Sequence, residues 1–277
     1  MNTQRILASL TRIPGTTALW RKFSLGSVET RVRFGIWQRP HYAYGCYHAA
    51  VLAHRLGLSG ITVIELGVAG GSGLLVLEEI AAAVSKAMGI EIDVVGFDSG
   101  QGMPAPVDYR DLPHVWNAGF YKMDKDRLKA QLSKAELCLG PISETIPVWL
   151  ARCRLPIGFV AFDLDYYSST VSGFRLFDSP GGSCHLPRVY CYFDDTYWPE
   201  HACHNEFIGE LRAIKEFNQA GEKKICPLHL LRHMRPHAAA WNDQIYIMHD
   251  FKHPLWCTNI TPQDDRHTQS PGGDSES

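Results

Sequence analysis

The sequence predicts an α/β protein with a doubly wound, mostly parallel, seven-stranded sheet and an N-terminal helical extension. Two observations support this fold class. Short apolar runs that are typical of buried strands alternate with segments whose apolar residues recur at helical spacing. Strands and helices that alternate in this way form parallel βαβ units. The composition of the 277 residues, 45% hydrophobic and 20% charged, is that of an ordinary globular protein.

The first half of the chain contains two strand signals separated by a glycine-rich turn. We expect a helix at 41–57, a strand at 61–66, a turn at 67–73, a helix at 74–88 and a second strand at 92–97. The helix at 41–57 is expected to be either a core helix or the contact of a homodimer. Residues 99–126 show no periodicity, and a stretch of that length inside a domain is usually functional. Its aromatic residues either cover a substrate or pack on the domain.

The second half continues the alternation and completes the sheet. We expect strands at 135–139, 157–162, 189–193, 225–231 and 244–249, and helices at 143–152, 168–177 and 201–220. An irregular insert is expected at 178–188. The chain is therefore divided into a basic arm and helical extension at 1–60, a main domain at 61–253 and a disordered tail at 258–277.

Charge and cysteine content limit the function classes. The formal net charge of −2 implies no bulk attraction to nucleic acid, and no apolar run approaches the roughly 18 residues of a membrane span. The eight cysteines are scattered without a CxxC pair, which favours a reducing, cytoplasmic setting. The basic start of the chain is interpreted as an arm on the domain, although its composition also resembles that of an organellar transit peptide.

Four carboxylates in two short clusters carry most of the functional information. Asp163 and Asp165 lie in FDLDYYSST, and Asp194 and Asp195 lie in YFDDTY. Each cluster follows a predicted buried strand, so the four side chains are expected to meet at one edge of the sheet. Like charges at such short range repel one another unless a cation or a proton lies among them. The clusters therefore predict a hard-metal site, a proton-abstracting site, or both.

The turn ELGVAGGSG, which follows the first strand, is typical of a nucleotide cradle. Its glycines allow a ligand to approach the backbone, and the next helix offers unpaired N–H groups. The spacing is neither GxGxxG nor a P-loop. Asp98 ends the second strand 25 residues after Gly73, where an acid can accept hydrogen bonds from both hydroxyls of a ribose. Such an acid suits NAD and S-adenosylmethionine equally.

With these motifs the chain resembles the class I S-adenosylmethionine-dependent methyltransferases. More narrowly it resembles the macrocin O-methyltransferase family, which methylates sugar hydroxyls with the help of magnesium. The blocks that carry this resemblance are ELGVAGGSG, GFDSGQGMPAP, LGPISETIP, FDLDYYSST and YFDDTY. They span residues 61–198. One departure is Thr196, which stands between the second aspartate pair and Tyr197.

The resemblance implies a Rossmann-like methyltransferase fold and specific roles for the motif residues. Asp163, Asp194 and Asp195 would be ligands of Mg²⁺, and Asp165 would be the general base. The residues implied at the S-adenosylmethionine site are Glu65, Gly67, Gly71, Ser72, Asp98 and Ser99. The implied partner is a small hydroxylated molecule, with no nucleic acid and no membrane.

This division of roles is chemically consistent. Magnesium prefers six oxygen ligands, so three aspartates leave about three positions for water or substrate oxygens. A bound metal lowers the pKa of a hydroxyl, and a neighbouring carboxylate can then remove its proton. Two alternatives remain open at this point. One is an NAD-dependent oxidoreductase on a similar sheet, and the other is a binding protein that kept the methyltransferase fold without turnover.

Overall fold

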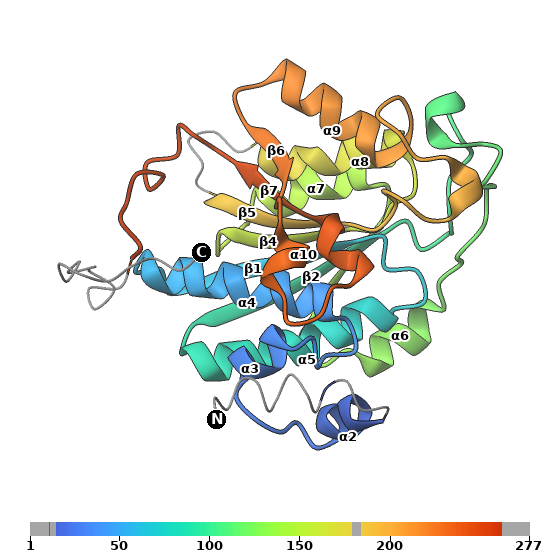
Figure 1. The fold of residues 1–277 in the computed structure, drawn as a ribbon. Coiled ribbons are helices and arrows are strands. Elements are labelled where there is room, and N and C mark those ends of the chain that lie inside the picture. The colour runs from blue at the N-terminus through green and yellow to red at the C-terminus, as the bar shows by residue number, and fades with distance from the viewer. Residues whose placement is uncertain (1–10, 12–14, 179–183, 262–277) are drawn as a thin grey trace.

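A single seven-stranded sheet forms the centre of the molecule (Figure 1). The computed structural model describes residue 11 and residues 15–178 and 184–261. In sheet order the strands are β3 (Glu136–Leu139), β2 (Glu91–Asp98), β1 (Gly60–Leu66), β4 (Ile157–Phe162), β5 (His185–Phe193), β7 (Ile245–His249) and β6 (Lys224–Pro227). Strands β3, β2, β1, β4 and β5 pair in parallel, whereas β7 runs antiparallel to both β5 and β6. This arrangement confirms the predicted fold class.

Helices cover both faces of this sheet. The α-helices are α2 (Thr16–Lys22), α3 (Val28–Arg33), α4 (Pro40–Arg55), α5 (Ser72–Met88), α6 (Lys125–Gln131), α7 (Ile142–Leu150), α8 (Tyr167–Gly173), α9 (Gly209–Ala220) and α10 (Leu231–Met234). Short 3-10 helices are η1 (Tyr109–Asp111), η2 (Phe174–Phe177), η4 (Glu200–Ala202) and η5 (Ala240–Gln244). Helices α4 and α5 lie on one face, and α7, α8 and α9 lie on the other (Figure 1).

The alternation of side chains along the strands builds a separate apolar cluster on each face. Neighbouring residues of β1 show this directly, because Val63 packs in the cluster beneath α4 and α5 and Ile64 packs in the cluster beneath α7 and α9. Both side chains have no solvent exposure. A strand that is buried on both sides reads as a continuous apolar run, which is why these strands were visible in the sequence.

Helix α4 belongs to the core, although it precedes the first strand. Gly45 of this helix faces the ring of Phe159, and a Cβ at that position would lie 2.2 Å from the ring. Glycine therefore allows α4 to lie directly on β4. The prediction of a core helix at 41–57 is confirmed. Residues 1–10 and 12–14 of the expected basic arm and helical extension at 1–60, and residues 262–277 of the expected tail, fall outside the described residues.

Two strand predictions are corrected at their boundaries. Strand β5 begins at His185, four residues before the predicted start. The strand can include Pro187, which has no N–H to donate, because its pairing with β4 is irregular at that point. The Pro187 carbonyl still accepts a hydrogen bond from Asp250 N at 3.0 Å. The predicted strand 225–231 ends already at Pro227, where His229 N donates to the carbonyl of Pro227 at 2.9 Å and closes a turn.

Two helix predictions were also too long. The segment predicted at 201–220 is an α-helix only from Gly209 onward, because the Asn205 side chain accepts a hydrogen bond from Phe207 N and holds a turn. The helix predicted at 168–177 ends at Gly173 and continues as η2.

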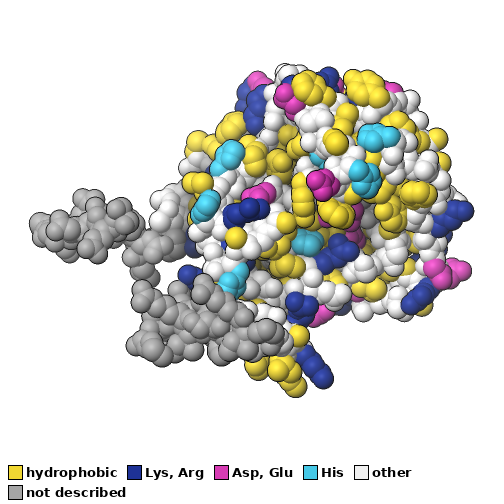
Figure 2. Space-filling model, turned by 45° about the vertical axis from the view of Figure 1, so that its right-hand side comes forward, with side chains coloured by type: hydrophobic (Ala, Val, Ile, Leu, Met, Phe, Trp, Pro, Cys, Tyr) yellow, Lys and Arg dark blue, Asp and Glu magenta, His cyan; other side chains and the backbone are white. Residues whose placement is uncertain are grey.

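The surface has no dominant charge on the side that can be seen. On the face drawn in Figure 2, described side chains of both charges lie singly among hydrophobic and histidine side chains. None of the helices of the described residues combines the length and apolar character needed to cross a membrane.

Candidate active site

The glycine turn between β1 and α5 is shaped by close backbone contacts. Gly67 has a φ of +86°, and a Cβ there would lie 1.8 Å from the carbonyl oxygen of Asp163. A Cβ at Gly73 would lie 1.8 Å from Oε1 of Glu65. Only glycine permits both approaches, so this turn lies against the end of β4 and over the Glu65 carboxylate.

Asp98, at the end of β2, ties this turn to the following loop. Its Oδ2 accepts a hydrogen bond from Ala69 N at 2.8 Å, and its Oδ1 accepts one from Gly100 N at 2.6 Å. Each carboxylate oxygen has a second lone pair, so these bonds leave acceptor capacity for a ligand. Ser99 stabilises the same loop, since its hydroxyl donates to the carbonyl of Gly102 at 2.9 Å.

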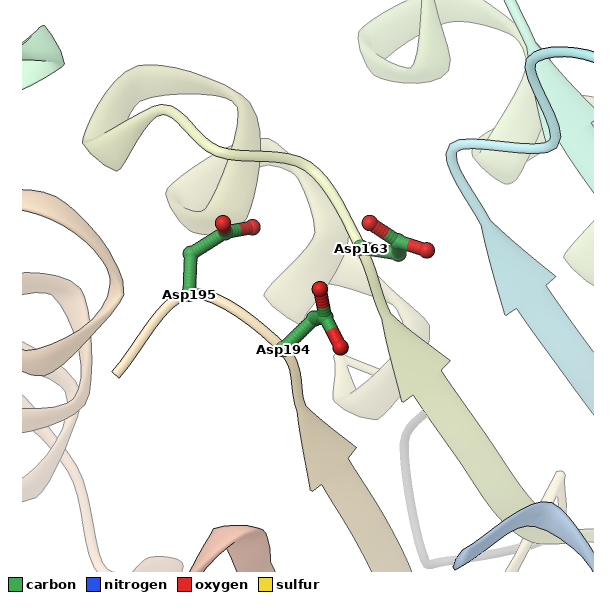
Figure 3. Close-up of side chains that lie close together, drawn as sticks. All are labelled: Asp163, Asp194 and Asp195. Atoms are coloured by element: carbon green, nitrogen blue, oxygen red, sulfur yellow. The ribbon is translucent and has the colours of Figure 1, made fainter. Parts of the chain in front are cut away.

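The structure brings the two aspartate clusters together, as predicted. Asp163, Asp194 and Asp195 each offer a carboxylate oxygen, and these atoms all lie within 4.8 Å of one another. Figure 3 shows the three side chains at the ends of the neighbouring strands β4 and β5. Backbone bonds hold this edge, because Asp163 N donates to Leu66 O and Asp194 N donates to Phe162 O, both at 3.0 Å.

Asp165 lies beside this group and is not one of its three members. It has a φ of +58°, a left-handed conformation that turns the chain away from β4. Its backbone N–H donates to Oδ2 of Asp195 at 3.0 Å. The left-handed turn therefore places the Asp165 main chain against the acidic group.

Glu210, near the start of α9, adds a further buried acid that was missed in the sequence. Its Oε2 accepts a hydrogen bond from Asp195 N at 3.0 Å, and its Oε1 is buried without a hydrogen-bond partner. The side chain has no solvent exposure. No local pattern distinguishes Glu210 from an ordinary acid in the first turn of a helix, which explains why it was missed.

Burial and mutual repulsion shape the protonation of these acids. Burial, followed by the charges of neighbouring acids, raises the pKa of Asp163, Asp195 and Glu210 well above their usual range. Burial also raises the pKa of Asp165 to about 6, and the charge of Asp194 adds to this shift. No Lys or Arg forms an ion pair with any of these acids within the described part of the chain. These acids therefore either hold protons or need a cation to be ionised together.

One cavity joins the glycine turn to the acidic group. It has a volume of about 670 Å³ and is lined by nine of the predicted site residues: Glu65, Gly67, Ser72, Asp98, Ser99, Asp163, Asp165, Asp194 and Asp195. Gly71 does not line it; this residue has a φ of +85°, and a Cβ there would lie 2.3 Å from the Leu128 side chain. Trp116 and Tyr121 of the aperiodic stretch line the cavity as well.

Sequence reasoning also missed two residues that lie next to the glycine turn. Tyr42 of α4 donates its hydroxyl to Oε1 of Glu65 at 2.6 Å. Arg39, directly before α4, donates to Tyr42 Oη at 3.3 Å and lines the cavity. Both come from the segment before the first strand, where no motif had indicated a site.

Comparison with known proteins gives matches among solved structures. No protein-family model matches the chain, and the search of curated proteins found no match. Among solved structures, the O-methyltransferase NovP is similar with a TM-score of 0.51 and 12% identity, over 84% of this chain and 99% of that chain. The calicheamicin methyltransferase CalS11 has a TM-score of 0.49 and 19% identity, over 90% of this chain and 93% of that chain.

The sheet order and the cavity at its carboxyl edge define a Rossmann-like α/β fold of the methyltransferase type. The likeness to NovP shows that the chain shares this fold with an O-methyltransferase. The resemblance predicted from the sequence motifs is thus confirmed at the level of the fold.

Proposed function

We propose that this protein is an S-adenosylmethionine-dependent O-methyltransferase that uses Mg²⁺ and acts on a hydroxyl of a small molecule. A sugar or another diol-bearing natural product is the proposed acceptor class. The observation that carries the proposal is the meeting of three aspartates with the glycine turn in one cavity. That NovP, which has the same fold, is an O-methyltransferase supports a hydroxyl acceptor.

The residues around the turn fit the cofactor. Gly67 and Gly73 leave no room for a side chain, so the backbone and Glu65 border the cavity directly. Asp98 keeps lone pairs free to accept the two ribose hydroxyls. When bound, S-adenosylmethionine would supply an activated methyl group, and the residues of this turn would hold it in the same cavity as the acidic group.

The donor set of the acidic group fits a hard divalent cation. Asp163, Asp194 and Asp195 offer oxygens at mutually short distances, as Mg²⁺ requires. When bound, the metal lowers the pKa of an acceptor hydroxyl. The buried carboxylates would in turn be relieved of their mutual repulsion.

Asp165 is the proposed general base. It lines the cavity next to the acidic group, and a carboxylate in that place can accept a proton from a hydroxyl. In this proposal it receives the proton of the acceptor hydroxyl during methyl transfer.

A reducing compartment such as the cytoplasm is the proposed location. Cys46 and Cys191 are free thiols in the core. Proteins of oxidising compartments commonly pair such residues.

Calorimetry with S-adenosylhomocysteine, S-adenosylmethionine and NAD tests the proposal. We expect both sulfur-containing ligands to bind and NAD not to bind. Binding of NAD alone would favour the oxidoreductase alternative. Failure of both sulfur-containing ligands to bind at millimolar concentration would contradict the proposed function. A protein that binds cofactor and Mg²⁺ but methylates none of a broad panel of diols would be a binding protein.

A further inference from the structure

Among the described residues that line the cavity, Arg39 is the single basic one. The same cavity is lined by six acids: Glu65, Asp98, Asp163, Asp165, Asp194 and Asp195. A lone cation in such a setting is expected to form an ion pair with one of them. Yet none of the ion pairs found in the described part of the chain involves Arg39.

The hydrogen bonds of Arg39 go to hydroxyl groups. One terminal nitrogen donates to Tyr42 Oη and the other donates to Ser72 Oγ, both at 3.3 Å. The guanidinium also lies 5.0 Å from the centre of the Tyr42 ring. These contacts are long and neutral, so the guanidinium is held in place at the cavity wall while most of its capacity for a charged acceptor is unused.

Through its bond to Ser72, the Arg39 guanidinium lies beside the N-terminus of α5, which also favours anions. Ser72 is the first residue of α5, a helix of 17 residues, whose N-terminal N–H groups follow the glycine turn. Next to it, a Cβ at Gly70 would meet nothing within 4 Å, so the turn is open on that side. The guanidinium and the start of α5 therefore both border the same part of the cavity.

Glu65 provides the complementary charge in the same region. Its Oε1 accepts the Tyr42 hydroxyl at 2.6 Å, while its Oε2 is buried and has no hydrogen-bond partner. The side chain is 1% exposed and lines the cavity. An unpaired buried acceptor is costly, so its presence points to a donor that arrives with the ligand.

Tyr42 thus bridges a guanidinium and a carboxylate that do not form an ion pair with each other. A ligand that carries an anion and a cation a few bonds apart can satisfy both groups at once. The α-carboxylate and α-ammonium of an amino acid have this arrangement.

We propose that Arg39, with Ser72, binds the α-carboxylate of the cofactor's amino-acid moiety, while Glu65 binds its α-ammonium group. This inference rests on the proposed function, because it assigns one end of S-adenosylmethionine. It makes the segment before β1 part of the cofactor site. Arg39 then confers specificity for cofactors that carry a carboxylate.

Ligands that differ only in this moiety provide the test. 5′-Methylthioadenosine contains the adenosine and the thioether sulfur but lacks the amino-acid group. We expect Arg39→Met to weaken binding of S-adenosylhomocysteine by roughly 10- to 100-fold, as for loss of a hydrogen bond to a charged group. Binding of 5′-methylthioadenosine should change by less than about twofold. Arg33→Met is the matched control, since Arg33 is exposed on α3 and should affect neither ligand.

The possible outcomes separate the two proposals. If the wild-type protein binds neither ligand, the proposed function fails. If it binds both, and Arg39→Met weakens both equally or neither, the assignment of Arg39 is overturned while the function stands. Equal weakening would mean that Arg39 only balances the charge of the acidic group.

A comparison on the wild-type protein covers the case in which the variant does not fold. Decarboxylated S-adenosylmethionine retains the amine and the sulfonium but has no carboxylate. We expect it to bind roughly 10- to 100-fold more weakly than S-adenosylmethionine. Equal affinities would overturn the proposal. Arg39→Lys, which keeps the charge but not the fork geometry, should recover part of the affinity lost in Arg39→Met.

Discussion

Acidic residues at one end of the sheet form ion pairs with arginines, whereas those at the other end lie close to one another. At the amino ends of β2 and β3, acids are paired with arginines: Arg154 lies 2.6 Å from Glu91 and 3.0 Å from Asp93, and Arg152 pairs with Glu136. At the carboxyl ends of β4 and β5, Asp163, Asp194 and Asp195 crowd within 4.8 Å, and no ion pair involving them is found among the described residues.

The difference shows which acids serve stability and which serve function. A hydrogen bond from Arg152 lowers the pKa of Glu136, which is the behaviour of a satisfied surface pair. Burial and Asp194 raise the pKa of Asp163 instead. An acid with a raised pKa in the folded state makes folding less favourable as the pH rises above its ordinary value. Buried acids with such raised pKa values are typical of sites where a ligand or a reaction needs the carboxylate charge.

Replacing the proposed base should have the largest effect. Asp165→Asn keeps the shape of the side chain but cannot accept a proton, so we expect the methyl-transfer rate to fall by roughly 10²- to 10⁴-fold. Cofactor affinity should be unchanged. Rate measurements on an accepted diol and calorimetry with S-adenosylhomocysteine would check both expectations. A variant that retains more than about a tenth of the rate would remove Asp165 from this role.

Metal binding should stabilise the protein through the carboxyl edge alone. At a Mg²⁺ concentration 100 times the dissociation constant, the free energy of unfolding should rise by about 2.7 kcal/mol. Asp163→Asn should abolish this gain, and a chelator should reverse it in the wild-type protein. Asp93→Asn, at the opposite end of the sheet, is the matched control and should keep the full gain. Thermal unfolding with and without Mg²⁺ provides the measurement, and equal gains in both variants would place the metal elsewhere.

The elements of the site that follow from local sequence could be predicted, and those that depend on tertiary contact could not. Asp163 and Asp194 follow apolar strands, and parallel strands bring their carboxyl ends to one edge, so their meeting was foreseeable. Glu210 reaches the site only because the start of α9 lies beside Asp195, and Arg39 only because α4 lies across β4. Neither position has a motif of its own. The family resemblance implied Gly71 at the cofactor site, yet Gly71 does not line the cavity, and a Cβ there would lie 2.3 Å from the Leu128 side chain.

The pH dependence of cofactor binding should be a smaller effect, and it tests whether the unpaired acid Glu65 at the carboxyl edge serves ligand binding. Burial raises the pKa of Glu65 to about 7, and the charge of Asp98 adds to this, although Tyr42 and Arg39 oppose the shift. Below pH 7 the acid is mostly protonated and cannot pair with an ammonium group. The affinity for S-adenosylhomocysteine should therefore rise by up to about tenfold per pH unit toward pH 7 and then level off. Glu65→Gln should bind more weakly and show no such rise, and an unchanged pH profile in that variant would contradict the role of Glu65.

The smallest effect is expected at the paired end of the sheet. Arg154→Ala removes the partner of Glu91 and Asp93. Arg154 and Glu91 are exposed and Asp93 is only partly buried, so water replaces the lost contacts and the thermal midpoint should shift only slightly. Mg²⁺ stabilisation and cofactor affinity should match those of the wild-type protein. Should Arg154→Ala instead reduce Mg²⁺ stabilisation as Asp163→Asn does, the acids at the two ends would be coupled. The crowded carboxylates at the carboxyl edge would then no longer mark a separate functional site, because charges at the opposite edge would also affect Mg²⁺ binding.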